Sequence, residues 1–217
     1  MIKKNIQRII QYRMCLLKFQ NLGFERIFSY TLAQEIGVSP EQVRKDFSQF
    51  NLRGNKKAGY KIQDLLDKIN ELLHKEDIHK IILAGLGNIG KALVQYKGFI
   101  NRNMQLVAGF DIDPAKLKKN CRIPVFRPEE MARVIREEKV RIGIIAVPEQ
   151  VAQEVCNQMV EAGITGILNF APVMLKTPPH VTVQNISVCN ELEALIYVSE
   201  KSASEKKGKE EKTSRTK

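Results

Sequence analysis

The sequence predicts an α/β protein in which a winged-helix domain precedes a Rossmann-type, doubly wound parallel sheet. Two observations predict the sheet. An apolar run, residues 81–84, ends in a G-x-G-x-x-G motif at Gly85–Gly90, and short apolar strands alternate with helical patterns beyond it. A third observation predicts the winged helix: two short helical patterns are joined by a turn at Gly37 and precede a basic loop punctuated by glycines.

Composition and charge fit two small domains of different character. The chain has 217 residues, of which 43% are hydrophobic, so it can bury real cores. Its net charge of +11 is uneven, since residues 1–75 hold 14 Lys and Arg against 7 Asp and Glu, whereas residues 76–199 hold 14 against 13. The basic N-terminal third indicates a module that binds a polyanion, although a solvated basic face would give the same composition.

The sequence carries no sign of export or of a metal centre. No apolar run reaches the roughly 18 residues of a membrane span, and residues 1–5 lack the apolar core of a signal peptide. The four cysteines are far apart and form no C-x-x-C pair, which predicts neither a disulfide framework nor a zinc site. We expect a cytoplasmic protein without a membrane partner or bound metal, in which Cys15, Cys156 and Cys189 are small core residues.

The N-terminal domain is expected to span residues 1–76. A first helix covers residues 3–20, and a second begins with Ser29 or Thr31 as its cap. The sequence Ser39-Pro40-Glu41-Gln42 then predicts a third helix, in which Ser39 is the N-cap and Gln42 completes a capping box. A fourth helix follows, with an apolar stripe within residues 62–73.

The third helix has the pattern of a recognition helix. Val43 and Phe47 face inward, whereas Arg44, Lys45 and Ser48 face outward and offer the donors needed to read DNA. The loop at residues 52–60, which carries Lys56 and Lys57, predicts a β-hairpin wing that reaches a DNA backbone or minor groove. The alternative is a helical bundle with an incidental basic loop.

The second domain, residues 77–186, is predicted to bind a dinucleotide. Gly85 permits the tight turn, Gly87 lets a pyrophosphate approach the backbone, and Gly90 lets helix and strand pack closely. The next strand ends at Asp111, where a carboxylate would bind the adenine ribose and repel a 2′-phosphate. This favours NAD over NADP, although the lysines at 116, 118 and 119 could tolerate a phosphate. The alternative is a degenerate nucleotide fold that binds nothing.

Further ligand contacts are expected where the parallel strands end, because dinucleotides bind at that edge of such sheets. The two redox forms share adenosine and pyrophosphate, so discrimination between them must lie at the nicotinamide, around which we place the aromatic side chains of Tyr96 and Phe99. The complete expected set is Gly85, Leu86, Gly87, Asn88, Ile89, Gly90, Tyr96, Phe99, Asp111, Ile112, Asp113, Ala146, Val147, Pro148, Asn169 and Phe170.

The C-terminal region divides into a helix and a tail. Residues 187–200 predict a helix whose apolar stripe, Val188, Leu192, Leu195 and Ile196, has little of its own subunit left to cover it, so we expect a dimerisation helix. Residues 201–217 consist mainly of Lys, Glu, Ser and Gly without large apolar residues, which predicts a disordered basic tail.

Six short stretches together carry a resemblance to a known family. They are Val43–Ser48, Gly59-Tyr60, Gly87–Gly90, Phe110–Asp113, Gly163–Pro172 and Glu191-Leu192. In this order and spacing they resemble the Rex family of bacterial redox-sensing repressors, and the likeness covers about residues 3–199.

The resemblance implies a homodimer that binds double-stranded operator DNA when NADH is scarce and releases it when NADH accumulates. It also implies a C-terminal domain-swapped helix, exchanged between subunits and docked between the partner's domains. With the resemblance, the expected DNA-binding residues are Arg8, Tyr12, Ser29, Ser39, Gln42, Arg44, Lys45, Ser48, Lys56 and Lys57.

Some positions depart from the family pattern. Glycine is usual where Asn51 and Lys57 stand in the wing, and Asp is usual where Ser187 stands before the last helix. Because Ser187 cannot form the interdomain ion pair of that Asp, we expect a coupling between NADH and operator at the low end of about 1–3 kcal/mol.

Two other classes of protein were weighed. An NAD-dependent dehydrogenase needs a general acid or base and a substrate domain, but the three histidines are His74 and His79 in a linker and His180 in a late loop. The chain beyond residue 172 is too short for a substrate domain, so no catalytic residue is expected. The other alternative is a DNA-binding regulator whose nucleotide site is empty or holds a different ligand.

Overall fold

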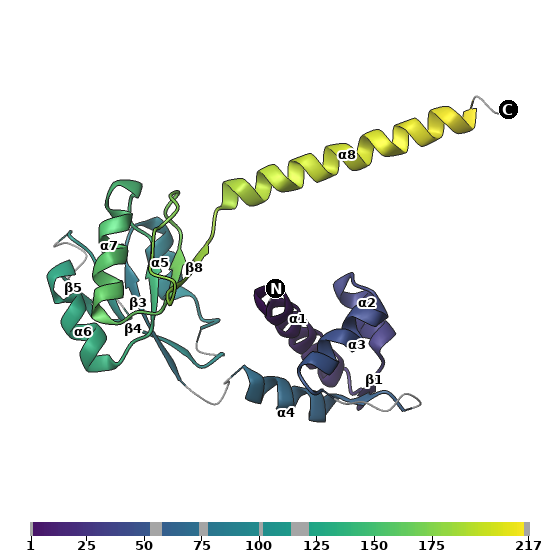
Figure 1. The fold of residues 1–217 in the computed structure, drawn as a ribbon, viewed down its shortest axis with the longest axis horizontal. Coiled ribbons are helices and arrows are strands. Elements are labelled where there is room, and N and C mark those ends of the chain that lie inside the picture. Colours follow the sequence, from purple (N-terminus) through teal and green to yellow (C-terminus); the bar gives the residue numbers. More distant parts are fainter. Residues whose placement is uncertain (1, 53–57, 74–77, 100–101, 114–121, 215–217) are drawn as a thin grey trace. The chain divides into compact units, whose positions relative to one another are not determined.

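The computed structural model describes residues 2–52, 58–73, 78–99, 102–113 and 122–214. The chain forms two compact units, Met1–Asp77 and Ile78–Lys217, and most of their helices and strands are labelled in Figure 1. Each unit has its own hydrophobic core, so each is described by itself.

The N-terminal unit is built from four helices and a small antiparallel sheet. Its core is closed by Ile9 and Leu16 from the first helix, Phe47 from the third and Ile69 from the fourth. In the sheet, Ile27 lies opposite Tyr60. The elements are α1 (Ile2–Asn21), β1 (Arg26–Ile27), α2 (Ser29–Ile36), α3 (Pro40–Gln49), β2 (Tyr60–Lys61) and α4 (Ile62–Leu72).

Local signals explain the start of α3 but not that of α2. Ser39 has an extended backbone, and its Oγ accepts a hydrogen bond from the N–H of Gln42 at 3.1 Å, which confirms the predicted cap. The predicted cap of α2 is wrong, because Phe28 occupies the N-cap position and makes no side-chain capping bond. The strand partner of β2 is β1, which precedes α2, and the predicted wing tip with Lys56 and Lys57 lies outside the described residues.

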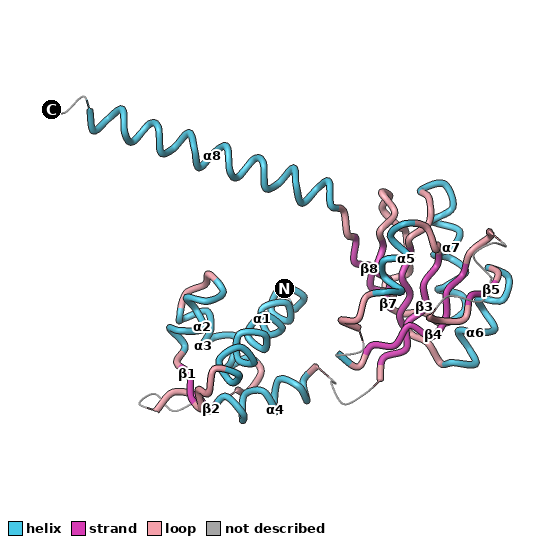
Figure 2. The backbone as a smooth tube through the Cα atoms, turned by 180° about the vertical axis from the view of Figure 1, so that it is seen from behind, coloured by secondary structure: helices cyan, strands magenta, loops and turns pink. Residues whose placement is uncertain are grey.

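The second unit contains a parallel sheet of six strands in the order β5-β4-β3-β6-β7-β8. From the central β3 the chain moves outward through β4 and β5, then returns to the other side of β3 with β6, as in Rossmann sheets. Figure 2 shows these strands side by side. They are β3 (His79–Ala84), β4 (Met104–Phe110), β5 (Val125–Phe126), β6 (Ile142–Ile145), β7 (Gly166–Asn169) and β8 (Thr182–Asn185).

Alternate residues of β3 belong to two different clusters, because successive side chains of a strand point to opposite faces of a sheet. Ile82 packs with α6 (Met131–Glu138) and α7 (Glu149–Ala162), whereas Leu83 packs with α5 (Asn88–Gln95). A short 3₁₀ helix, η3 (Pro128–Glu130), leads into α6. The helices α6 and α7 therefore lie on one face of the sheet and α5 on the other, as the predicted fold class requires.

The last helix, α8 (Val188–Ser214), continues through the tail for which composition predicted disorder. Lys, Glu and Ala are strong helix formers, so the absence of apolar residues there does not prevent a helix. The side chains of Val188, Leu192 and Leu195 are 68%, 52% and 63% exposed, and Cys189 is exposed rather than buried in a core as predicted. Within the described residues, no helix combines the length and apolar character needed to cross a membrane.

The turn from β3 into α5 is the tightest point of the second unit. Gly85 has a φ of +90°, which favours glycine. A Cβ there would lie 2.4 Å from the carbonyl oxygen of Ala146, the residue that follows β6. A Cβ on Gly90 would lie 2.0 Å from the carbonyl oxygen of Gly85, so α5 rests on the turn with no side chain between them. A Cβ on Gly87, in contrast, would meet nothing within 4 Å.

These contacts separate two substitutions that look alike in the sequence. Gly90→Ala should lower the free energy of unfolding by about 1–3 kcal/mol, because backbone must shift to admit the methyl group. Gly87→Ala should change it by less than about 0.5 kcal/mol. Urea unfolding followed by circular dichroism measures both, and equal effects of the two substitutions would contradict the close approach at Gly90.

Candidate nucleotide pocket and recognition helix

A pocket of about 660 Å³ opens at the carboxyl ends of the central strands, on either side of the point where the strand order reverses. Open α/β sheets bind their ligands at this point because the loops on its two sides diverge. From the predicted set, the pocket is lined by Gly85, Gly87, Ile89, Asp111, Ile112, Ala146, Val147, Pro148 and Phe170.

The glycine turn provides the part of the pocket that fits a pyrophosphate. Gly87 is the N-cap of α5, and the space in front of its α-carbon is open. The first N–H groups of a helix have no partner within the helix and carry a partial positive charge. A phosphate can therefore approach the backbone here closely, which a side chain at Gly87 would prevent.

Asp111 orders the glycine turn and still faces the pocket. Its side chain is 8% exposed, and its carboxylate accepts hydrogen bonds from the N–H of Leu86 at 2.7 Å and the N–H of Asp113 at 3.0 Å. A carboxylate oxygen can accept more than one hydrogen bond, so this group suits the hydroxyls of a ribose. Glu129 and Glu154 also line the pocket, and the three carboxylates disfavour an additional phosphate on the ribose.

One wall of the pocket was missed by the sequence analysis. It belongs to α7, from which Val151, Glu154, Val155 and Gln158 face the cavity. These positions follow the i, i+3, i+4, i+7 spacing of one helical face, and α7 begins just after β6 ends, so this pattern could have found them. Ala84, Phe110, Pro128, Met131 and Pro172 complete the lining.

Tyr96 and Phe99, which were predicted to surround the nicotinamide, do not line this pocket. They form an edge-to-face pair, with ring centroids 5.2 Å apart, in a second pocket of about 600 Å³ beside Met104 and Leu106. The reason is direction: α5 begins at the carboxyl edge of the sheet and runs back towards the opposite edge, so its last residues lie far from its first. Val147, Pro148 and Phe170, just beyond the ends of β6 and β7, form an apolar part of the pocket wall.

Five more predicted ligand contacts do not line this pocket. Asn169 has no exposed surface and uses its side-chain amide within the protein. Leu86 and Gly90 are buried, and neither Asn88 nor Asp113 lines the pocket. The motif therefore contributes its turn geometry and its N–H groups rather than each of its side chains.

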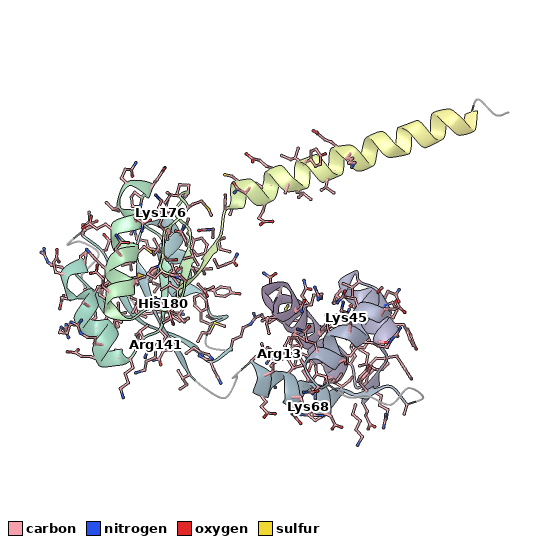
Figure 3. All side chains as sticks on the ribbon, in the orientation of Figure 1. Arg13, Lys45, Lys68, Arg141, Lys176 and His180 are labelled. Carbon is pink, nitrogen blue, oxygen red and sulfur yellow. The ribbon has the colours of Figure 1, made fainter. Side chains whose placement is uncertain are left out.

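The recognition helix α3 presents a polar outer side. Arg44, Lys45 and Ser48 are exposed, and Lys45 is labelled in Figure 3. The guanidinium of Arg44 donates to Ser29 Oγ at 3.1 Å and to the carboxylate of Glu41. Ser29 and Ser39, both in the predicted DNA-binding set, thus lie beside α3 and at its start.

On its inner side, α3 is held by a buried carboxylate that the sequence analysis did not single out. Asp46 is 1% exposed and accepts bonds from Arg8 Nε at 2.6 Å, Arg8 Nη2 at 2.7 Å, the Tyr12 hydroxyl at 3.0 Å and Gln42 Nε2 at 2.7 Å. Burial alone would raise the pKa of Asp46, but the hydrogen bonds from Arg8, Gln42 and Tyr12 outweigh it and lower that pKa. Burial raises the pKa of Tyr12, and its bond to Asp46 raises it further.

This network contains three residues of the predicted DNA-binding set. Tyr12 is completely buried and cannot touch DNA, and the side chains of Arg8 and Gln42 are directed at Asp46. Gln42 consequently does not complete the predicted capping box. The sequence did contain a signal for this network. Arg8 and Tyr12 on α1, and Gln42 and Asp46 on α3, each have the i, i+4 spacing that places two side chains on the same face of a helix.

Comparison with known proteins matches both units. Residues 3–48 match a family model described as a putative DNA-binding protein N-terminus, and residues 76–173 match a CoA binding domain model. The redox-sensing transcriptional repressor Rex of Pelotomaculum thermopropionicum is 42% identical over 88% of this chain and 91% of the relative. The corresponding protein of Desulforamulus reducens is 38% identical over 88% and 92%.

Solved structures agree with this likeness. The crystal structure of RSP, a Rex-family repressor, is 29% identical, covers 95% of this chain and 97% of RSP, and has a TM-score of 0.85. RSP in complex with β-NAD⁺ and operator DNA has a TM-score of 0.87 over 95% and 96% of the two chains, again at 29% identity. This confirms the predicted combination of a winged-helix unit with a Rossmann-type sheet.

A winged-helix unit joined to a dinucleotide-binding sheet defines a class of DNA-binding regulators that respond to a nucleotide. Within that class, this chain belongs to the Rex family of redox-sensing transcriptional repressors, as its identity to curated members over most of its length shows.

The Asp46 network generates a prediction about stability and pH. Asp46→Ala should lower the free energy of unfolding at pH 7 by about 3 kcal/mol. This is the low end of the cost of removing one partner of a buried ion pair, because the Arg8 side chain is 21% exposed. Asp46 has a lowered pKa in the folded state, so its contribution is present above the unfolded pKa and disappears as pH falls through the folded value.

The exposed pair Lys18–Glu35 supplies the control. Its side chains are 56% and 34% exposed, so Glu35→Ala should cost less than about 1 kcal/mol. Urea titrations at pH 7 and in steps below pH 4 compare both variants with wild type. An Asp46→Ala cost that matches that of Glu35→Ala, or stays constant into acid, would show that the network does not stabilise this unit through its charge.

Proposed function

We propose that the chain is a transcriptional repressor that binds operator DNA through α3 as a homodimer and releases it when NADH occupies the pocket of the second unit. The observation that carries the proposal is the pocket itself: a Rossmann switch point with open space at Gly87 and a carboxylate at Asp111, in a chain that also has a recognition helix. RSP, with the same fold over 95% of this chain, has been solved with β-NAD⁺ and operator DNA and with β-NADH.

Redox discrimination follows from the apolar side of the pocket. The nicotinamide ring is a cation in NAD⁺ and neutral in NADH, and Val147, Pro148 and Phe170 offer it no charged partner. Removing a cation from water costs free energy that a neutral ring does not lose, so this wall favours NADH. The adenosine and pyrophosphate bind alike in both forms and set the common affinity.

Dimerisation would be supplied by α8. Its apolar residues Leu192, Leu195 and Ile196 are each more than half exposed, and such a stripe is stable in water only when another surface covers it. A two-fold dimer presents two copies of α3 to DNA, which requires a palindromic operator with half-sites spaced by whole helical turns.

The proposed activity is regulatory rather than enzymatic and belongs in the cytoplasm, where chromosomal DNA and NADH meet. Among the described residues lining the pocket, the ionisable side chains are the carboxylates of Asp111, Glu129 and Glu154. A second candidate is a regulator that responds to coenzyme A, since residues 76–173 match a family model described as a CoA binding domain. Competition between CoA and NADH for the purified protein separates the two.

The proposal predicts reciprocal coupling between NADH and DNA. NADH should dissociate the wild-type chain from a duplex that it selected out of a random-sequence pool, and saturating duplex should weaken NADH by the same factor. Gly87→Val fills the open space at the helix start and should leave a repressor that binds the duplex but is not released. Fluorescence titrations measure both affinities, and an NADH affinity that is independent of the duplex would refute the proposal.

A separate prediction concerns base reading. Arg44→Ala should weaken the selected duplex more than an unrelated duplex, by about 1–3 kcal/mol if the guanidinium makes a bidentate contact to a base. Lys68→Ala removes the same charge from the exposed side of α4, labelled in Figure 3, and should leave the specificity ratio unchanged. An equal loss on both duplexes for Arg44→Ala would assign Arg44 to phosphate binding instead.

A further inference from the structure

A fully buried polar side chain shapes the wall of the nucleotide pocket. Asn169, the last residue of β7, has 0% exposure. Its Nδ2 donates to the carbonyl oxygens of Val173 at 2.8 Å and Ala171 at 3.2 Å, and its Oδ1 accepts the N–H of Ala171 at 3.0 Å. These bonds fold residues 170–173 into a turn, and Phe170 and Pro172 of this turn line the pocket.

The remainder of this connection is fixed independently. Beyond the turn, Lys176 lies beside α7 (Figure 3). The side chain of Gln153 on that helix accepts the N–H of Lys176 at 2.9 Å and donates to its carbonyl oxygen at 3.0 Å. The segment is therefore anchored to α7 at its far end, and Asn169 controls the part that faces the ligand.

The same residue also holds the start of α8. Asn169 Nδ2 donates to Asn185 Oδ1 at 2.9 Å, and the carbonyl oxygen of Asn169 accepts the N–H of Ile186 at 2.8 Å. The next residue, Ser187, caps α8, because its Oγ accepts the N–H of Asn190 at 3.2 Å. Asn185 and Ile186, which are both bonded to Asn169, thus directly precede the helix cap.

We propose that Asn169 is a positioning residue that couples the wall of the nucleotide pocket to the start of α8. An amide nitrogen has two hydrogens, but three acceptors surround this one, in Ala171, Val173 and Asn185. A shift of the turn that strengthens the bonds to Ala171 and Val173 weakens the bond to Asn185, and the reverse holds as well. This inference rests on the proposed function and adds the route by which the pocket reaches the dimerisation helix.

Asn185 allows the route to be interrupted without emptying the pocket. Asn185→Ala removes one of the three acceptors and leaves both hydrogens of Asn169 with partners, so no buried polar group loses all its bonds. Asn185→Asp keeps an oxygen for Asn169 Nδ2 but loses the donor that faces the Met174 sulfur at 3.4 Å. Thr182→Ala changes an exposed side chain on the same strand and serves as the control.

The experiment uses the full chain and measures NADH affinity with and without a saturating duplex selected by the wild-type protein. The ratio of the two affinities is the coupling. Asn185→Ala should retain NADH affinity within about three-fold and lose about five-fold in this ratio, within the range by which residues between two sites alter coupling. Asn185→Asp and Thr182→Ala should keep the wild-type ratio.

Each other outcome counts against the inference. A wild-type ratio for Asn185→Ala overturns it, as does an equal loss for Thr182→Ala, which would trace the effect to strand stability. A loss of NADH binding itself in Asn185→Ala would place Asn185 in the binding site instead. A ratio of one for the wild type would refute the proposed function, and the inference would fall with it.

Discussion

The nucleotide-binding unit depends on the close approach of three backbone segments at the end of β3. A Cβ on Gly90 would collide with the carbonyl oxygen of Gly85, and a Cβ on Gly85 would collide with the carbonyl oxygen of Ala146. The N–H of Gly85 is bound to Phe110, and the N–H of Ala146 to Ala84, each at 2.8 Å. One turn therefore sets the spacing of β3, α5 and β6, and at Gly87 the backbone faces open space.

Each unit places a buried polar residue directly behind the surface that binds. Asp46 faces inward from α3, whose outer side carries Arg44 and Lys45, and Asn169 precedes the turn that carries Phe170. An apolar residue at these places would pack without fixing direction, whereas several hydrogen bonds to one group fix both distance and angle. On the proposed function, these two side chains fix the orientation of the elements that bind DNA and the nucleotide.

The sequence predicted those features that depend on neighbouring residues. The glycine motif, the carboxylate at Asp111 and the cap at Ser39 are each defined by a few consecutive positions, and the structure shows each of them. The errors concern residues whose role depends on distant partners. Tyr12 is of a residue type that often contacts DNA, but it is buried and donates a hydrogen bond to Asp46 on another helix. Tyr96 follows the glycine motif closely in the sequence, but it lies at the other end of α5.

On the proposed function, affinity and redox response belong to different walls of one pocket. The turn at Gly87 and the carboxylate of Asp111 meet groups that NADH and NAD⁺ share, so changes there alter both affinities together. The wall at Val147, Pro148 and Phe170 meets the ring whose charge differs. In the inference drawn from Asn169, this second wall is connected to the start of α8. A ligand shifts a conformational equilibrium only by its differential affinity for the two states, so the part of the pocket that distinguishes the redox forms must also be the part that the rest of the chain can sense.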